Sequence, residues 1–304
     1  MRKYRTRVFG AALLAVALLA AACGSGEGTT IIVGSTNFPE QEILGEIYAQ
    51  VLEAEGYPVE KKFQLGSREV VEPAIEAAEI GLYAEYVATV LSFLARPDAP
   101  RSDIRDVDAA HAELTERFAD RGVMVLDYAP AIDANAIVVT KATADQLGLA
   151  KVSDLVPHAG QLVFGGPPEC PTREFCEIGL RDVYGIEFAE FRPLDVGGPI
   201  TVTALATGEI DVALLFSSDG AIAANGFVVL EDDRHLQGAD NIVPVVRLDL
   251  VDEYGSALTD LIDRVTAKIT TSELSQMNRR VNIDLDDPSA VARDWLVTNG
   301  FIDA

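Results

Sequence analysis

Short apolar runs alternate with helical patterns over almost the whole length of this chain. Runs at residues 30–33, 63–65 and 81–83 are each followed by a segment of helical periodicity. The alternation continues with runs at residues 123–126, 136–140, 162–164, 211–216, 227–230 and 243–246. This pattern is typical of α/β folds. With 304 residues, 49% of them apolar, the chain has the length of about two domain-sized units and can bury a large core.

The clearest local signal is the start of the helix expected after the first run. Asn37 is a capping residue type, Glu40 follows three positions later, and Gly56 can end the helix after an apolar stripe. Free backbone N–H groups at Asn37 and Phe38 would then form a polar edge at the carboxyl end of a strand. Open α/β sheets bind their ligands at this edge.

The first 22 residues have the features of an export signal. Basic side chains at positions 2, 3, 5 and 7 precede an uncharged run of 15 residues, shorter than the roughly 20 that a membrane-spanning helix needs. The run ends in Ala-Ala-Ala before Cys23, which resembles the lipobox of bacterial lipoproteins. We therefore expect a signal peptide at 1–22, lipidation of Cys23, and a tether at 23–29 on the outer face of the cytoplasmic membrane. The alternative is an ordinary secreted protein cut before Cys23.

Composition excludes several other classes of protein. A net charge of -24 repels phosphate backbones, so we expect no nucleic-acid partner. With only 3 His and no paired Cys/His spacing, a zinc site is disfavoured, and we expect no metal and no cofactor. Cys170 and Cys176 flank five residues, and an oxidising compartment favours a disulfide between them.

Several motifs, in order along the chain, resemble one known family. Gly-Ser-Thr-Asn-Phe-Pro-Glu-Gln at 34–41 and Ile-Leu-Gly-Glu at 43–46 resemble the GSKNFTEQ-x-ILGE opening of the substrate-binding proteins of osmoprotectant (glycine betaine, choline, carnitine) ABC importers. Further matching motifs are Leu-Gly-Ser at 65–67, Leu-Tyr-Ala-Glu-Tyr at 82–86, Gly-Glu-Ile-Asp at 208–211 and Ser-Asp-Gly at 218–220. The resemblance covers nearly the whole chain after the signal.

This resemblance implies the α/β two-lobed periplasmic-binding-protein fold of type II. It implies that residues 30–132 plus 241–304 form lobe one and that residues 133–240 form lobe two, with crossings near Asp133 and Asp240. It also implies a monomer that performs no chemistry. Such a receptor binds a small-molecule solute between its lobes and delivers it to a membrane permease driven by a separate ATPase.

Some residues of the family's ligand site are retained. Tyr86 matches a tyrosine of the aromatic box that holds a quaternary ammonium, and Thr89 matches its hydroxyl partner. Asp133 also fits, and Arg173 matches the arginine for a ligand carboxylate. The opening motif adds candidate ligand contacts at Ser35, Thr36 and Asn37.

Other positions depart from the family pattern. Asn135 and Asp240 stand where the family has box tyrosines, Phe216 replaces a tyrosine, and Thr36 replaces the opening lysine. Losing two aromatic walls would remove about 1 to 4 kcal/mol of cation binding. The substituted acceptors suggest an alternative ligand, an amino acid or polyamine-like cation with N–H donors. A secreted hydrolase with paired carboxylates and a sensor without transport are the competing functional classes.

Overall fold

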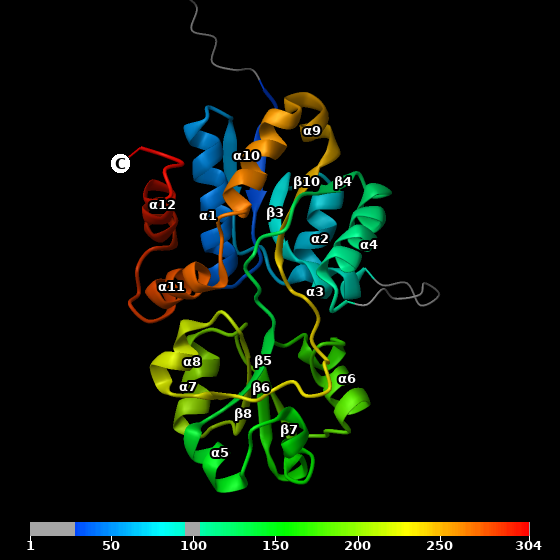
Figure 1. The fold of residues 1–304 in the computed structure, drawn as a ribbon, viewed down its shortest axis with the longest axis vertical. Helices are drawn as coiled ribbons and strands as arrows, with labels where there is room; N and C mark the ends of the chain where they lie inside the picture. Colours follow the sequence, from blue (N-terminus) through cyan, green and yellow to red (C-terminus); the bar gives the residue numbers. More distant parts are fainter. Residues whose placement is uncertain (1–27, 95–103, 304) are drawn as a thin grey trace, which may run out of the picture.

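The computed structural model describes residues 28–94 and 104–303. The expected signal peptide, Cys23 and most of the tether therefore lie outside the described residues. Two five-stranded sheets, each with helices packed against it, form the two halves of the molecule (Figure 1). In the part of the chain that the structure describes, no helix is long and apolar enough to cross a bilayer.

The first sheet has the strand order β2-β1-β3-β10-β4. Strand β1 pairs in parallel with β2 and β3, and β10 is antiparallel to both β3 and β4. The strands are β1 (Ile31–Gly34), β2 (Val59–Lys62), β3 (Leu82–Tyr86), β4 (Val123–Val125) and β10 (Ile242–Arg247). The helices of this half are α1 (Pro39–Ala54), α2 (Arg68–Glu76), α3 (Val87–Phe93), α4 (Val107–Ala119), α9 (Leu248–Tyr254), α10 (Ser256–Thr266), α11 (Thr271–Asn282) and α12 (Pro288–Thr298).

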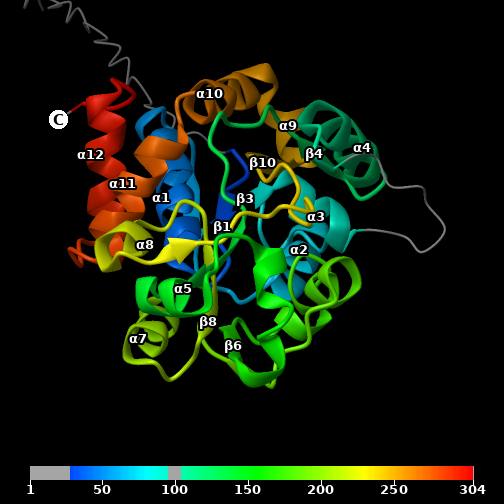
Figure 2. The same ribbon diagram turned by 60° about the horizontal axis from the view of Figure 1, so that its bottom comes forward.

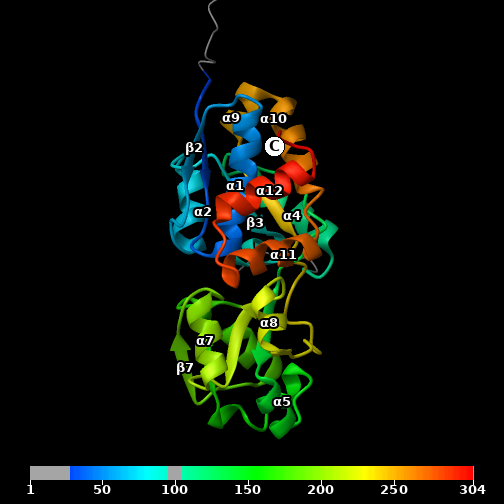
Figure 3. The ribbon, with the colours of Figure 1, turned by 90° about the vertical axis from the view of Figure 1, so that its left-hand side faces the viewer.

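Two apolar cores enclose this sheet. One joins α1, α10, α11 and α12 to one face, and the other joins α2, α3 and α4 to the opposite face. Helix α1 packs along α12 (Figure 3). Because both faces are covered, the central strand β3 is buried at every position. The end of β3 therefore lies between packed helices at the edge that faces the second half.

The second sheet has the order β7-β6-β8-β5-β9. Strand β6 pairs in parallel with β7 and β8, and β5 is antiparallel to β8 and β9. The strands are β5 (Asn135–Val139), β6 (Val163–Gly166), β7 (Glu190–Pro193), β8 (Val212–Phe216) and β9 (Val228–Val229). The helices are α5 (Lys141–Leu147), α6 (Glu177–Gly179), α7 (Pro199–Thr207) and α8 (Gly220–Asn225), with 3₁₀ turns at Val152–Leu155, Ala159–Gln161 and Cys170–Thr172 and a π turn at Leu180–Tyr184.

Two neighbouring segments connect the halves. The chain passes to the second sheet between β4 and β5 and returns between β9 and β10. Ile132 forms an antiparallel bridge with Asn241, and the Asp133 N–H donates to the carbonyl of Asp240 at 2.9 Å. Helix α11 also contacts α8 across the two halves (Figures 2 and 3).

Two local predictions from the sequence are wrong. The second strand occupies Val59–Lys62, before the apolar run at 63–65. Phe63 is apolar because its ring packs beside Gly45 of α1, and not because it belongs to a buried strand. Helix α1 is capped by the extended residue Phe38, without a side-chain cap, and the N–H of Asn37 is bonded to the Gly66 carbonyl. That N–H is therefore not available to a ligand.

Candidate functional site

A cavity of about 540 Å³ lies between the two halves. The first half lines it with Thr36, Phe38, Gln41, Arg68, Glu69, Glu85, Tyr86, Thr89, Ser92 and Phe93. The second half lines it with Asn135, Pro167, Glu169, Cys170, Thr172, Arg173, Glu174, Phe175, Cys176, Val196, Leu214 and Phe216, and Asp133 lines it from a crossing segment. The cavity therefore faces the ends of strands from both sheets, where α/β folds bind ligands.

Three aromatic rings stand together on the wall of this cavity. The ring of Phe38 stacks on Phe216 with centroids 5.1 Å apart and on Tyr86 at 6.2 Å. Tyr86 ends β3, Phe216 ends β8, and Phe38 precedes α1, so the group combines both halves. Clustered ring faces attract a cation that cannot donate hydrogen bonds. From the sequence, Phe38 is expected to contribute only its backbone N–H, although it belongs to the opening motif at 34–41.

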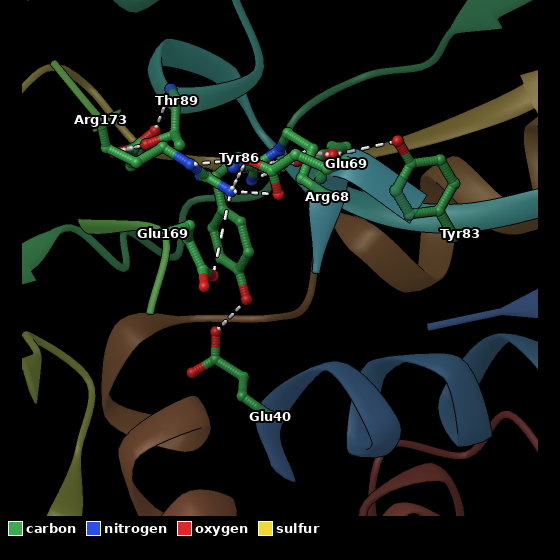
Figure 4. Close-up of polar contacts among 10 residues, drawn as sticks. Glu40, Arg68, Glu69, Tyr83, Tyr86, Thr89, Glu169 and Arg173 are labelled. Carbon is green, nitrogen blue, oxygen red and sulfur yellow. Dashed lines mark hydrogen bonds and ion pairs between the residues drawn. The ribbon is translucent and has the colours of Figure 1, made fainter. Parts of the chain in front are cut away.

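The hydroxyl of Tyr86 is held by a buried carboxylate. It donates to Glu40 Oε1 at 2.7 Å (Figure 4). The other oxygen, Oε2, accepts from Ser218 Oγ at 2.6 Å and from the Asn278 amide. Burial raises the pKa of Glu40, against the opposing effect of these hydrogen bonds. Its place in the first turn of α1 also favours the ionised form.

Asp133 lies beside this carboxylate at the start of the second half. Its Oδ1 accepts from the Ser218 N–H at 2.8 Å, and only 4% of the residue is exposed. Burial and the neighbouring charge of Glu40 raise the pKa of Asp133 well above its usual value. Two adjacent buried carboxyl groups favour a single negative charge between them.

A buried ion pair forms another part of the wall. Arg68 donates from Nε to Glu85 Oε1 at 2.8 Å and from Nη2 to Oε2 at 2.7 Å, and both residues are buried. Tyr83 also donates to Glu85 Oε1 at 3.0 Å. This two-point contact pairs the charge of the Arg68 guanidinium with the Glu85 carboxylate inside the protein.

Arg173 lines the cavity from the loop closed by the Cys170–Cys176 disulfide. The disulfide agrees with the sequence prediction. The Arg173 guanidinium reaches across to α2, where Nε donates to Glu69 Oε1 at 3.1 Å and Nη2 donates to Oε2 at 2.9 Å (Figure 4). Glu169 Oε1 lies 3.9 Å from Nη2. The predicted carboxylate-binding residue thus stands at the cavity with its charge already matched.

The remaining candidates from the sequence separate into two groups. Thr36, Thr89 and Asn135 line the cavity, and Asn135 donates from Nδ2 to the Phe175 carbonyl at 3.0 Å. Three others, Ser35, Asn37 and Asp240, are absent from the cavity lining among the described residues. Ser35 Oγ accepts from the Gln64 N–H.

Asp240 lies behind Thr89. Its carboxylate accepts from the Thr89 N–H and from Thr89 Oγ1, each at 2.7 Å, and the residue is 1% exposed. Burial raises the pKa of Asp240 to about 6, although the hydrogen bonds from Thr89 and the charge of Arg68 oppose that rise. The structure therefore places this carboxylate where it orients a cavity residue.

Two α/β halves, joined by two adjacent crossings around a polar and aromatic cavity, define a two-lobed solute-binding protein of the type II class. Residues 29–298 match the family model of the substrate binding domain of ABC-type glycine betaine transport systems. The chain belongs to this family. Its members bind a substrate for a transporter, so the family points to binding and not to catalysis.

Known relatives match over nearly the whole chain. Glycine betaine-binding protein YehZ of Escherichia coli is 27% identical over 278 residues, with 88% of this chain and 90% of the relative covered. Carnitine transport binding protein OpuCC of Listeria monocytogenes is 26% identical, covering 100% and 99%. Among solved structures, a glycine betaine/carnitine/choline ABC transporter protein has a TM-score of 0.69 at 25% identity, with 90% of this chain and 100% of that chain covered.

Proposed function

We propose that this protein is the extracytoplasmic receptor of an ABC importer and that it binds a small quaternary ammonium osmoprotectant between its lobes. The observation that carries the proposal is the ring group of Phe38, Tyr86 and Phe216, which lines a cavity large enough for such a ligand. Each ring face that meets the cation contributes about 0.5 to 2 kcal/mol. The relatives named for glycine betaine and carnitine support the same ligand class.

The phenylalanines compensate for the box positions that lack a tyrosine. Asn135 offers no ring, but Phe38 stacks on both Tyr86 and Phe216 and adds a third ring to the cavity wall. Thr36 and Thr89 would contact the polar end of the ligand. Thr36 Oγ1 is buried at the cavity without a hydrogen-bond partner among the described residues, which suits a ligand or water group at that place.

The partners follow from the receptor role. The lobes, 30–132 plus 241–304 and 133–240, would close on the solute about the paired crossing segments at Ile132 and Asn241. The closed receptor, a monomer held to the membrane through Cys23, would then deliver the solute to a permease with its ATPase. Signal cleavage at 1–22 and lipidation are part of this proposal.

The second candidate ligand is a cation with N–H donors. The observation that favours it is the excess of carboxyl groups over arginines on the cavity wall. The lining carboxyl groups are those of Glu69, Glu85, Asp133, Glu169 and Glu174, against the two guanidinium groups of Arg68 and Arg173. Carboxylate oxygens are good partners for N–H donors. A polyamine-like amine would use them more fully than a quaternary ammonium.

Calorimetric titration of the exported protein separates these ligands. The panel is glycine betaine, choline, carnitine and proline betaine against arginine and small polyamines. We expect saturable binding of at least one quaternary ammonium compound and no turnover of the bound compound. Tight binding of the amines alone would favour the second candidate. No detectable binding of any compound in the panel would contradict the proposed ligand class.

A further inference from the structure

We propose that Glu69 selects the charge class of the ligand by occupying Arg173 across the cleft. The cavity would then favour a cation that carries no carboxylate over a zwitterion. This inference rests on the proposed function, because it concerns the same cavity. It assigns a role to a residue of α2 that the motifs did not single out.

The contact between Glu69 and Arg173 is a two-point ion pair between the lobes. Both oxygens of Glu69 accept from the guanidinium, at 3.1 and 2.9 Å. Ser67 Oγ donates to Glu69 Oε2 at 2.6 Å and holds the carboxylate in place. Although burial acts in the opposite direction, these hydrogen bonds and the charge of Arg173 lower the pKa of Glu69. The Glu69 carboxylate is therefore ionised at neutral pH and balances the positive charge of Arg173.

The described lining of the cavity offers no unpaired cation that could bind a ligand carboxylate in place of Arg173. The other lining arginine, Arg68, is bound in a buried two-point contact to Glu85. Glu169 lies 3.9 Å from Arg173, and Glu174 accepts from Ser92 Oγ at 2.6 Å. Each lining guanidinium thus has a lining carboxylate as its partner, and a second carboxylate, that of Glu169, lies near Arg173.

A ligand carboxylate would meet an unfavourable exchange here. To reach Arg173 it must displace Glu69, which leaves that carboxylate without its cation, and it must lie near Glu169, whose Oε1 is 3.9 Å from Arg173 Nη2. Like charges at such separations repel. A ligand with a neutral polar end causes no exchange and leaves the bridge between the lobes intact.

Choline and glycine betaine test this directly, because they share the trimethylammonium group and differ in a hydroxyl against a carboxylate. For the exported protein in nonionic detergent we expect choline to bind more tightly, by about two- to fivefold, the scale of a solvent-screened ion pair such as that of the exposed Glu69 with Arg173. In Glu69→Gln, Arg173 loses its main partner. We expect the choline preference to fall by about two- to fivefold, through a gain in betaine affinity.

The matched control is Glu55→Gln, which removes the same charge from the exposed end of α1 and should leave the choline-to-betaine ratio unchanged. Glu169→Gln is a second variant in case Glu69→Gln is unstable, and we expect it to shift the ratio in the same direction. A wild-type preference for betaine, or a ratio that neither variant moves, would overturn the role of Glu69 while leaving the receptor function intact. Binding of no quaternary ammonium compound would reject both.

Discussion

The hydroxyl of Tyr86 donates a 2.7 Å hydrogen bond to Oε1 of Glu40, and the second oxygen of that carboxylate accepts from Ser218. Tyr86 and Glu40 belong to the first half of the molecule, whereas Ser218 follows β8 in the second. The orientation of a cavity ring is therefore linked through one carboxylate to a contact between the halves. The proposed ligand contact of Tyr86 and the contact between the halves therefore depend on the same carboxylate.

The ring and the hydroxyl of Tyr86 have separable roles. Tyr86→Leu removes a ring face and should weaken binding of a quaternary ammonium by about 2- to 30-fold, corresponding to 0.5 to 2 kcal/mol. Tyr86→Phe keeps the face but leaves Glu40 Oε1 without its donor, which should lower the free energy of unfolding by about 1 to 3 kcal/mol. Calorimetry and denaturant titration measure the two effects.

Tyr57 provides the control for this pair. It stacks edge-on against Tyr254 and is absent from the described cavity lining, so Tyr57→Leu should lower stability without changing ligand affinity. Equal affinity losses in Tyr86→Phe and Tyr86→Leu would contradict the assignment of the ring face as a cation contact.

Ser218→Ala should shift the unliganded protein towards an open arrangement. The change deletes the 2.6 Å hydrogen bond to Glu40 and the 3.0 Å contact with Asn278, both made between the halves. Hydrogen bonds to charged groups are worth about 1.5 to 3 kcal/mol, so affinity should fall by about tenfold or more. Small-angle X-ray scattering should report a larger radius of gyration than for the exposed-site control Ser272→Ala. An unchanged radius together with unchanged affinity would argue against a closure contact.

Asp240 should make stability depend on pH in a defined direction. Burial raises its pKa to about 6 in the folded state, against about 3.9 unfolded, so the folded protein binds the proton more tightly. This contribution to stability is complete below about pH 4 and is lost as pH rises through 6. Relative to wild type, Asp240→Asn should therefore gain about 2 kcal/mol between pH 4 and pH 7.

Urea titrations across that pH range measure this difference, since groups common to both proteins cancel. Asp252→Asn, at an exposed position, should follow the wild-type curve. A wild-type minus Asp240→Asn difference that is flat with pH would show that the carboxylate titrates normally.

The architecture could be predicted from sequence because buried strands carry dense apolar runs. Such runs fall on or beside β1, β3, β5 and β8, which are largely buried. The edge strands were harder. Strand β7 was missed because Glu190–Pro193 is partly exposed and contains charged residues and a proline. Strand β2 is displaced from its predicted place because Val59–Lys62 is also partly exposed and three of its four residues are charged.

The candidate site was only partly predictable. The motifs identified Tyr86, Phe216 and Arg173 as cavity residues. Tyr86 and Arg173 match residues of the family's ligand site, and Phe216 stands at the position of a family tyrosine. No local pattern could show that Glu69 meets Arg173, because the two are 104 residues apart and belong to different halves of the molecule. Asp240 was predicted as a ligand contact from its position, but only the packing of α3 shows that Thr89 lies in front of it.

The Cys170–Cys176 disulfide should stabilise the protein and position its charged loop. It closes a loop with a sequence separation of 6, for which the chain-entropy relation gives about 2 kcal/mol. A Cys170→Ser and Cys176→Ser double variant should therefore have a lower melting temperature and weaker ligand binding, because Cys170, Phe175 and Cys176 of this loop form part of the cavity wall. Dithiothreitol should reproduce the loss in wild type and leave the variant unchanged. If dithiothreitol lowers the melting temperature of both proteins equally, the effect does not come from this disulfide.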